Sequence, residues 1–183
     1  MQSFQMSWQN PFMAGSGRKW NEVAEKPQTE PVEPPRGFFS AHVDDKGRLK
    51  LPVEFQQYFT AIGDDRYFVT SVDDRIARIY PISLWKGNEK ILEELAAEDP
   101  DAAEALAFVA NDYGAEAKVD PQGRMTLPTD LRRALALESQ EVRLDCSQGA
   151  VNIYSKAEYE TRKQKAKDGL AEKLKTAKLK GFK

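Results

Sequence analysis

VDDKGRLKLP at residues 43–52 and VDPQGRMTLP at residues 119–128 are two copies of one sequence motif, offset by 76 residues. Six of the ten positions are identical, and they include an Asp, a Gly, an Arg and the closing Leu-Pro. Self-similarity at a fixed offset indicates one supersecondary unit that is used twice. The sequence therefore predicts a duplicated module.

Each copy has the pattern of a β-hairpin that leads into a helix. Asp44 and Asp120 can accept hydrogen bonds from the backbone of a turn, and Gly47 and Gly123 supply the positive φ that such a turn needs. After the turn, Arg-Leu-Lys-Leu and Arg-Met-Thr-Leu alternate polar and apolar residues, which is typical of a strand buried on one face. Pro then closes the strand and opens a helix.

The remaining elements of the two copies also correspond. Short amphipathic helices are predicted over residues 53–59 and 129–137. A second strand pair follows in each copy, over 67–70 with 75–80 and over 141–145 with 150–154.

Outside the two copies, composition divides the chain further. Asp99-Pro100 is an N-cap followed by Pro at the first helical position, and Ser155-Lys156-Ala157-Glu158 is a capping box, so a helix is expected to start at each. Helices are predicted over 88–97 and 99–110. The expected organisation is a proline-containing disordered leader (1–36), a first module (37–85), a helical connector (86–113), a second module (114–159) and a Lys-rich helical or disordered tail (160–183).

Charge is distributed unevenly along the chain. The net charge is −2, but residues 156–183 carry ten Lys and Arg against four Asp and Glu, a net of +6, so residues 1–155 carry −8. An acidic body is not a uniformly basic surface for nucleic acid, and any DNA contact must be local. The tail is interpreted either as a solvated extension or as a non-specific anchor for phosphates, whose contacts weaken with salt.

The reactive residue types are too few for catalysis. His42 and Cys146 are the only His and Cys, so neither a metal site nor a Cys/His nucleophile can be assembled within one chain. We expect no enzyme activity, no cofactor, no metal and no small-molecule substrate. A single Cys excludes a disulfide framework and suits a reducing compartment. Without an apolar run of membrane-spanning length or a signal-peptide pattern, a cytoplasmic protein is expected.

With both copies in view, the chain resembles the MraZ family of bacterial transcriptional regulators, which are built from two AbrB-like (SpoVT/AbrB) modules. The resemblance covers roughly residues 38–160. It rests on D-x-x-x-R in each half, on the stretch Ile79-Tyr80-Pro81-Ile82-Ser83-Leu84-Trp85, and on the run GAEAKVDPQGRMTLPTDLRRAL that starts at Gly114.

The resemblance implies both a fold and a function. The fold is α+β with a mainly β core, in which duplicated AbrB-like modules form a double-split β-barrel with flanking helices. The function is nucleoid-associated DNA binding by a ring of chains at short direct repeats, as a repressor of the chain's own division and cell-wall operon. In the family the D-x-x-x-R residues read DNA, so the expected DNA-binding residues are the two motifs and the turn residues between them: Asp44, Lys46, Gly47, Arg48, Asp120, Gln122, Gly123 and Arg124.

The chemistry of the repeated Asp and Arg supports this role. The guanidinium of Arg is a rigid fork that pairs bidentately with guanine or with phosphate. An Asp four residues earlier can hold the fork in place and lower the entropy lost on docking. Alternatively, Asp and Arg pair only with each other and contribute little. Retention of Asp, Gly and Arg in both copies, while the two intervening positions vary, favours the functional interpretation.

Energetics favours assembly of several chains. One good bidentate base contact gives about 1–3 kcal/mol of discrimination, so two arginines on an acidic monomer cannot hold a site alone. Several chains on spaced repeats gain by effective concentration, which predicts a cyclic homo-oligomer on double-stranded DNA. The alternatives are an AbrB-like antitoxin or other protein-interaction module, and a non-specific nucleoid protein with equal affinity for any duplex.

Overall fold

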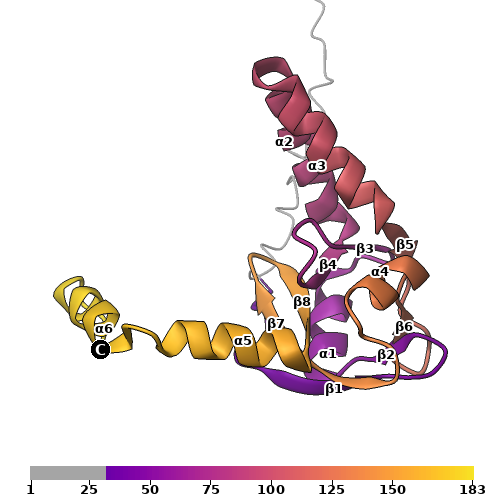
Figure 1. Ribbon diagram of the computed structural model, residues 1–183. Helices are drawn as coiled ribbons and strands as arrows, with labels where there is room; N and C mark the ends of the chain where they lie inside the picture. Colours follow the sequence, from indigo (N-terminus) through magenta and orange to yellow (C-terminus); the bar gives the residue numbers. More distant parts are fainter. Residues whose placement is uncertain (1–31) are drawn as a thin grey trace, which may run out of the picture. The chain divides into compact units, whose positions relative to one another are not determined.

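The computed structural model describes residues 32–183 (Figure 1). Most of the expected disordered leader, residues 1–36, lies outside this range. The described chain forms eight strands and six helices, in the order β1 (Phe39–Val43), β2 (Arg48–Lys50), α1 (Val53–Ile62), β3 (Tyr67–Thr70), β4 (Ala77–Pro81), α2 (Ile82–Glu98), α3 (Pro100–Asp112), β5 (Ala115–Ala117), β6 (Arg124–Thr126), α4 (Thr129–Ala134), β7 (Gln140–Ser147), β8 (Ala150–Ser155), α5 (Lys156–Lys167) and α6 (Leu170–Leu179).

All eight strands belong to one antiparallel sheet, in the order β5-β3-β4-β8-β7-β1-β2-β6. The two end strands also approach each other, because Val119, just after β5, forms a bridge with Met125 of β6. The sheet is therefore a nearly closed barrel. The predicted α+β class with a mainly β core and flanking helices is confirmed.

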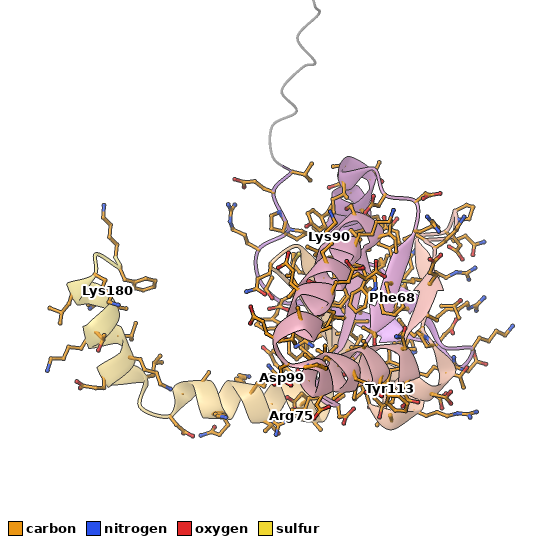
Figure 2. All side chains as sticks on the ribbon, turned by 90° about the horizontal axis from the view of Figure 1, so that it is seen from above. Phe68, Arg75, Lys90, Asp99, Tyr113 and Lys180 are labelled. Carbon is orange, nitrogen blue, oxygen red and sulfur yellow. The ribbon has the colours of Figure 1, made fainter. Side chains whose placement is uncertain are left out.

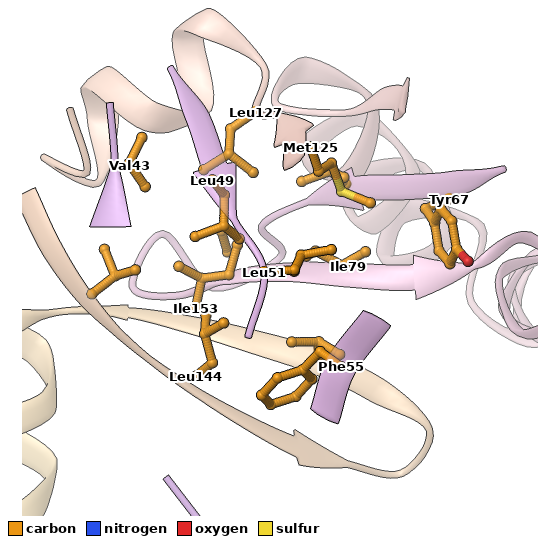
Figure 3. Packing of buried hydrophobic residues seen from close by; sticks show 14 of the residues in the cluster. Val43, Leu49, Leu51, Phe55, Tyr67, Ile79, Met125, Leu127, Leu144 and Ile153 are labelled. Atoms are coloured by element: carbon orange, nitrogen blue, oxygen red, sulfur yellow. The ribbon is translucent and has the colours of Figure 1, made fainter. Parts of the chain in front are cut away.

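The two repeats are interleaved in this sheet, because the pairs β3-β4 and β1-β2 of the first copy are flanked on both sides by strands of the second. Strands β1–β4 come from the first copy and β5–β8 from the second. Four pairings cross between them: β1 with β7, β2 with β6, β3 with β5, and β4 with β8. Both repeats consequently fill the same core. In Figure 3, Leu49 of β2 and Met125 of β6, both fully buried, lie among side chains from the other strands.

The connector helices differ from the sequence prediction at one end. Helix α2 begins at Ile82 rather than at residue 88, because the carboxylate of Asp64 accepts hydrogen bonds from the backbone N–H and the hydroxyl of Ser83, at 2.9 and 2.7 Å. Helix α3 begins where the sequence predicts, and the Asp99 carboxylate accepts a bond from the Ala102 N–H at 3.0 Å. The two helices pack against each other.

Smaller shifts affect the other predicted elements. Helix α1 extends to residue 62 and α4 stops at 134, while β7 runs from 140 to 147. Strand β4 begins at Ala77 rather than at 75, because the Asp73 carboxylate holds Arg75 and Ile76 in a turn through their N–H groups.

The Lys-rich tail is helical, in two segments. The Ser155 hydroxyl accepts the Glu158 N–H at 3.3 Å and caps α5, as predicted, although the Glu158 carboxylate turns to Arg162 instead of completing the capping box. Gly169, with φ of 66°, separates α5 from α6. Within residues 32–183, no helix combines the length and the apolar character needed to cross a membrane.

Candidate nucleic-acid interface

The first repeated turn is organised by the carboxylate of Asp44. One oxygen, Oδ1, accepts hydrogen bonds from the backbone N–H groups of Lys46 and Arg48, at 3.0 and 2.8 Å. The other, Oδ2, accepts from Arg48 Nε at 2.7 Å and lies 2.6 Å from its Nη2. Gly47 adopts a φ of 74° and its N–H bonds to the Asp44 carbonyl, which closes the turn. One side chain thus fixes both the backbone of the turn and the direction of the guanidinium.

The second turn repeats this geometry. Oδ1 of Asp120 accepts from the N–H groups of Gln122 and Arg124, at 2.8 and 2.9 Å, and Oδ2 accepts from Arg124 Nε at 2.9 Å. Gly123 has a φ of 71°. Two sequences that differ at the variable turn positions therefore fold to the same arrangement.

The charged partners also shift the ionisation of the two carboxyls. The side-chain hydrogen bond from Arg48, together with the turn N–H groups, lowers the pKa of Asp44 to about 2. The pKa of the Asp120 carboxyl is also lowered, mainly by the hydrogen bond from the backbone N–H of Arg124. Hydrogen bonding to Asp44 raises the pKa of Arg48. Both pairs therefore stay ionised at neutral pH.

The two arginines lie on one face of one two-stranded ribbon. In the pairing of β2 with β6, Arg48 lies opposite Thr126, and Lys50 lies opposite Arg124. Residues directly opposite in an antiparallel pair point to the same side of the sheet. The intervening pair, Leu49 with Met125, is fully buried and points to the core. Arg48, Lys50, Arg124 and Thr126 therefore share the outer face.

Each arginine is positioned beside its turn rather than at the apex. The side chains of Arg48 and Arg124 are 30% and 29% exposed, so they are held against the surface but are not sealed inside. Lys50 also bonds to the backbone carbonyl of Gln122, which ties the second turn to the first hairpin. Residues 43–50 and 119–126, which form the two turns with β2 and β6, carry four cations against three carboxylates: Lys46, Arg48, Lys50 and Arg124 against Asp44, Asp45 and Asp120.

Each turn is supported from behind by the helix of the other repeat. A Cβ on Gly47 would lie 2.6 Å from the guanidinium of Arg132 in α4, and a Cβ on Gly123 would lie 2.4 Å from the amide of Gln56 in α1. Gln56 and Arg132 are themselves 76 residues apart. The positive φ favours glycine at these two positions, and a Cβ there would also displace the end of the side chain that the opposite helix supplies.

The same two side chains hold the strand that follows each turn. Gln56 donates to the carbonyl of Leu51 at 2.7 Å, and Arg132 donates to the carbonyl of Leu127 at 3.0 Å. The N–H of each of these leucines bonds to the carbonyl of the glycine in the other turn. The two turns are therefore joined into one unit.

The structure brings all eight sequence-predicted residues together at the paired turns. Sequence reasoning missed Lys50 and Thr126, although the alternation of polar and apolar residues places them on the same side as the arginines. It also missed Gln56 and Arg132, whose only signal in the sequence is that they occupy corresponding positions in the two copies, 76 residues apart. No group of three or more His, Cys, Asp or Glu residues within 32–183 is arranged to hold a metal ion.

Comparisons with known proteins agree on one family. Residues 114–181 match the family model described as "MraZ protein, putative antitoxin-like". A protein of Acidobacterium capsulatum named "Transcriptional regulator MraZ" is 37% identical over 99 residues, which are 54% of this chain and 67% of that protein. A protein of Desulfitobacterium hafniense with the same name is 32% identical over 135 residues, 74% of this chain and 90% of that protein. The chain belongs to the MraZ family.

Membership in the MraZ family confirms the resemblance drawn from the doubled motif. The family match also continues past residue 160, where the sequence resemblance stopped, to residue 181. The Lys-rich helices α5 and α6 are thus part of the region shared with MraZ proteins.

Proposed function

We propose that the chain is a sequence-specific DNA-binding regulator of transcription that contacts duplex DNA through the outer face of β2 and β6. The observation that carries the proposal is the position of Arg48 and Arg124 on one face of that ribbon, each oriented by its own Asp. A two-stranded ribbon fits the major groove of B-DNA, and Arg is the side chain that most often contacts guanine there. The names of the MraZ relatives, which are transcriptional regulators, support the same function.

The paired carboxylates act as orienting groups in this proposal. The carboxylates of Asp44 and Asp120 accept hydrogen bonds from the turn backbone and from Nε of the arginine. Nη1 of Arg48 and of Arg124 makes no hydrogen bond within residues 32–183. A guanidinium that is already held in one direction loses little freedom when it meets a base. The exposed turn residues Lys46 and Gln122 then lie where they can contact the flanking phosphates.

The proposal includes assembly on DNA. Two arginines give about 1–3 kcal/mol each, whereas specific complexes exceed non-specific ones by about 4–10 kcal/mol. A cyclic homo-oligomer that places several β2–β6 ribbons on short direct repeats closes this gap through effective concentration. We propose that these repeats lie upstream of the chain's own operon and that binding represses it, which places the protein in the cytoplasm on the nucleoid.

A competition gel shift tests the proposal. The chain's own upstream DNA is labelled and competed, at fixed salt, with unlabelled random duplex. We expect Arg48→Ala and Arg124→Ala each to abolish the preference for the upstream DNA, and Arg133→Ala, an exposed arginine of α4 outside the ribbon, to leave it unchanged. Circular dichroism verifies that each variant is folded.

Other outcomes would identify the alternatives. Equal competition by random duplex indicates a non-specific nucleoid protein. No shift with any duplex refutes DNA binding and leaves the antitoxin-like interaction module. Undiminished preference in both arginine variants refutes the assignment of the site to β2 and β6.

A further inference from the structure

An apolar groove with a cationic rim lies where α5 leaves the barrel. Its volume is about 350 Å³. The apolar wall consists of two tyrosines from β8 and α5, a phenylalanine that precedes β1 and a leucine of α6: Phe38, Tyr154, Tyr159 and Leu170. The cations along the groove come from α5: Arg162, Lys163 and Lys167. We call this surface the basic groove.

Aromatic contacts hold the basic groove in shape. Phe38 packs edge-on against Tyr154 and Tyr159, with ring centroids 5.7 and 5.1 Å apart. Arg162 lies 5.5 Å from the Tyr154 ring centroid, and Lys163 lies 5.6 Å from that of Tyr159. Phe38 nevertheless remains 50% exposed. The groove is a preformed aromatic site that nothing within residues 32–183 covers completely.

The charges along the groove are only partly neutralised. Arg162 pairs with Glu158 at 2.6 Å and lies 3.8 Å from Asp73, and Lys163 lies 3.6 Å from Glu160. Lys167 makes no ion pair with any described residue. The groove therefore favours an occupant that brings both an apolar side chain and carboxylates.

Helix α3 presents a surface of this chemistry. Phe108 is 71% exposed, the largest exposed fraction of any aromatic side chain in residues 32–183. Glu104 and Asp112 lie four residues before and after it, and residues four apart occupy one face of a helix. Both acidic residues are exposed, and neither forms an ion pair with another described residue. We call Glu104, Phe108 and Asp112 the acidic face of α3.

The charge balance of the two regions agrees with this match. Residues 86–112, which span most of α2 and α3, carry eight Asp and Glu against two Lys, a net of −6, while residues 156–183 carry +6. Figure 2 labels Lys90 in α2, Asp99 between α2 and α3, and Lys180 directly after α6. No ion pair within residues 32–183 engages a carboxylate of α2 or α3. Two equal and opposite charges on one chain suit contact between copies.

We propose that the acidic face of α3 of one chain docks into the basic groove of a second copy. Phe108 enters the apolar groove beside Phe38, while Glu104 and Asp112 pair with Lys163 and Lys167. The contact is heterologous, because each chain contributes a different surface at each of its two interfaces, and such contacts close into rings or continue as filaments. The proposal deepens the proposed function, since it names the surfaces that would assemble the regulator.

Sedimentation velocity of the full chain without DNA tests the proposal. We expect the wild type to sediment as an assembly of several 20.7 kDa chains, and Phe108→Ser to sediment as a single chain. The matched control is Ile91→Ser, which removes an apolar side chain that is 61% exposed on the neighbouring helix α2 and should leave the assembly intact. A monomeric wild type, or an unchanged mass for Phe108→Ser, overturns the proposal.

Mixing two defective variants gives a sharper result. Phe108→Ser removes the apolar side chain of the acidic face, and the double variant Lys163→Glu with Lys167→Glu reverses two of the three groove cations. Each retains one working surface, so a mixture should form dimers and nothing larger. Two variants that remain monomeric in the mixture overturn the heterologous contact. Adding Glu104→Lys and Asp112→Lys to the groove variant exchanges the charges of the two surfaces and should restore part of the assembly that the groove variant loses.

DNA binding distinguishes this proposal from the proposed function. Phe108→Ser keeps both arginines of the ribbon and should still prefer a single upstream repeat over random duplex, with weaker affinity for several repeats. If the groove variant loses affinity for random duplex while its mass is unchanged, the Lys-rich helices bind DNA rather than a second copy, and the proposal fails even though DNA recognition stands.

Discussion

Single side chains determine how the repeated motif works, and Asp44 is the clearest case. It bonds to two backbone N–H groups and to the guanidinium of Arg48. The sequence predicts a functional turn at the motif because Asp, Gly and Arg recur at one spacing. The role of Asp44 as an orienting group was one of two interpretations, and the observed bonds supply the geometry that this interpretation requires.

Removing the charge of Asp44 should change the pH dependence of stability. The side-chain bond from Arg48 lowers the pKa of Asp44 to about 2, below the value of about 3.9 for an unfolded chain. A lowered folded-state pKa stabilises the protein above the unfolded value, and this stabilisation is lost as pH falls toward 2. In Asp44→Asn we expect a lower midpoint of thermal unfolding at pH 7, with a difference from wild type that shrinks below about pH 4.

The control for this prediction is the neighbouring carboxylate. Asp45→Asn removes the same charge one residue further along, where the side chain accepts no hydrogen bond from the described chain. It should lower the midpoint less at pH 7. Equal effects of the two substitutions would show that only overall charge matters.

At the scale of elements, sequence predicted those whose signals are local. The hairpin turns, the start of α3 at Asp99 and the start of α5 at Ser155 were confirmed because a cap or a turn is written in adjacent residues. The start of α2 was wrong by six residues because its cap, Asp64, lies 19 residues away from Ser83. A contact between residues so far apart cannot be recognised from the sequence pattern around the helix start.

Replacing the glycine of the first turn and the glycine of α2 by alanine should have opposite effects on the stability of the protein. Gly47→Ala should destabilise the protein, because its φ of 74° costs a residue with a Cβ about 1–2 kcal/mol and the new atom meets Arg132 at 2.6 Å. Gly87→Ala, in α2 with open space around it, should stabilise the protein by about 0.5–1 kcal/mol. Urea unfolding of each variant measures both changes.

A second substitution separates the two causes at Gly47. Arg132→Ala removes the side chain that a Cβ would meet, so Gly47→Ala should cost less in that background, with the backbone strain remaining. An equal cost in both backgrounds would mean that the approach of Arg132 is not limiting.

At the scale of the whole molecule, the crossing strand pairs make the two repeats interdependent. Sequence indicated two modules and the resemblance implied a barrel, but which strands exchange could not be read from a pattern that is the same in both halves. The pairing of β1 with β7 and of β3 with β5 requires strands from both repeats. Neither repeat can satisfy its strand edges or bury its core residues alone.

Separating the halves should therefore abolish the fold. Residues 32–113 and 114–183, produced as two chains, should each lack cooperative thermal unfolding as a monomer, and mixing them should restore it. Circular dichroism during heating, with sedimentation to establish monomers, is the measurement. Cooperative unfolding of either half as a monomer would contradict the shared core.

For the DNA contact proposed at β2 and β6, the reciprocal support of the turns has a consequence. Arg132 lies behind the turn that carries Arg48, and Gln56 lies behind the turn that carries Arg124. A mutational library aimed at one arginine must accordingly include the helix of the opposite repeat. Under the proposed function, substitutions of Gln56 or Arg132 are therefore expected to alter DNA specificity without touching a base.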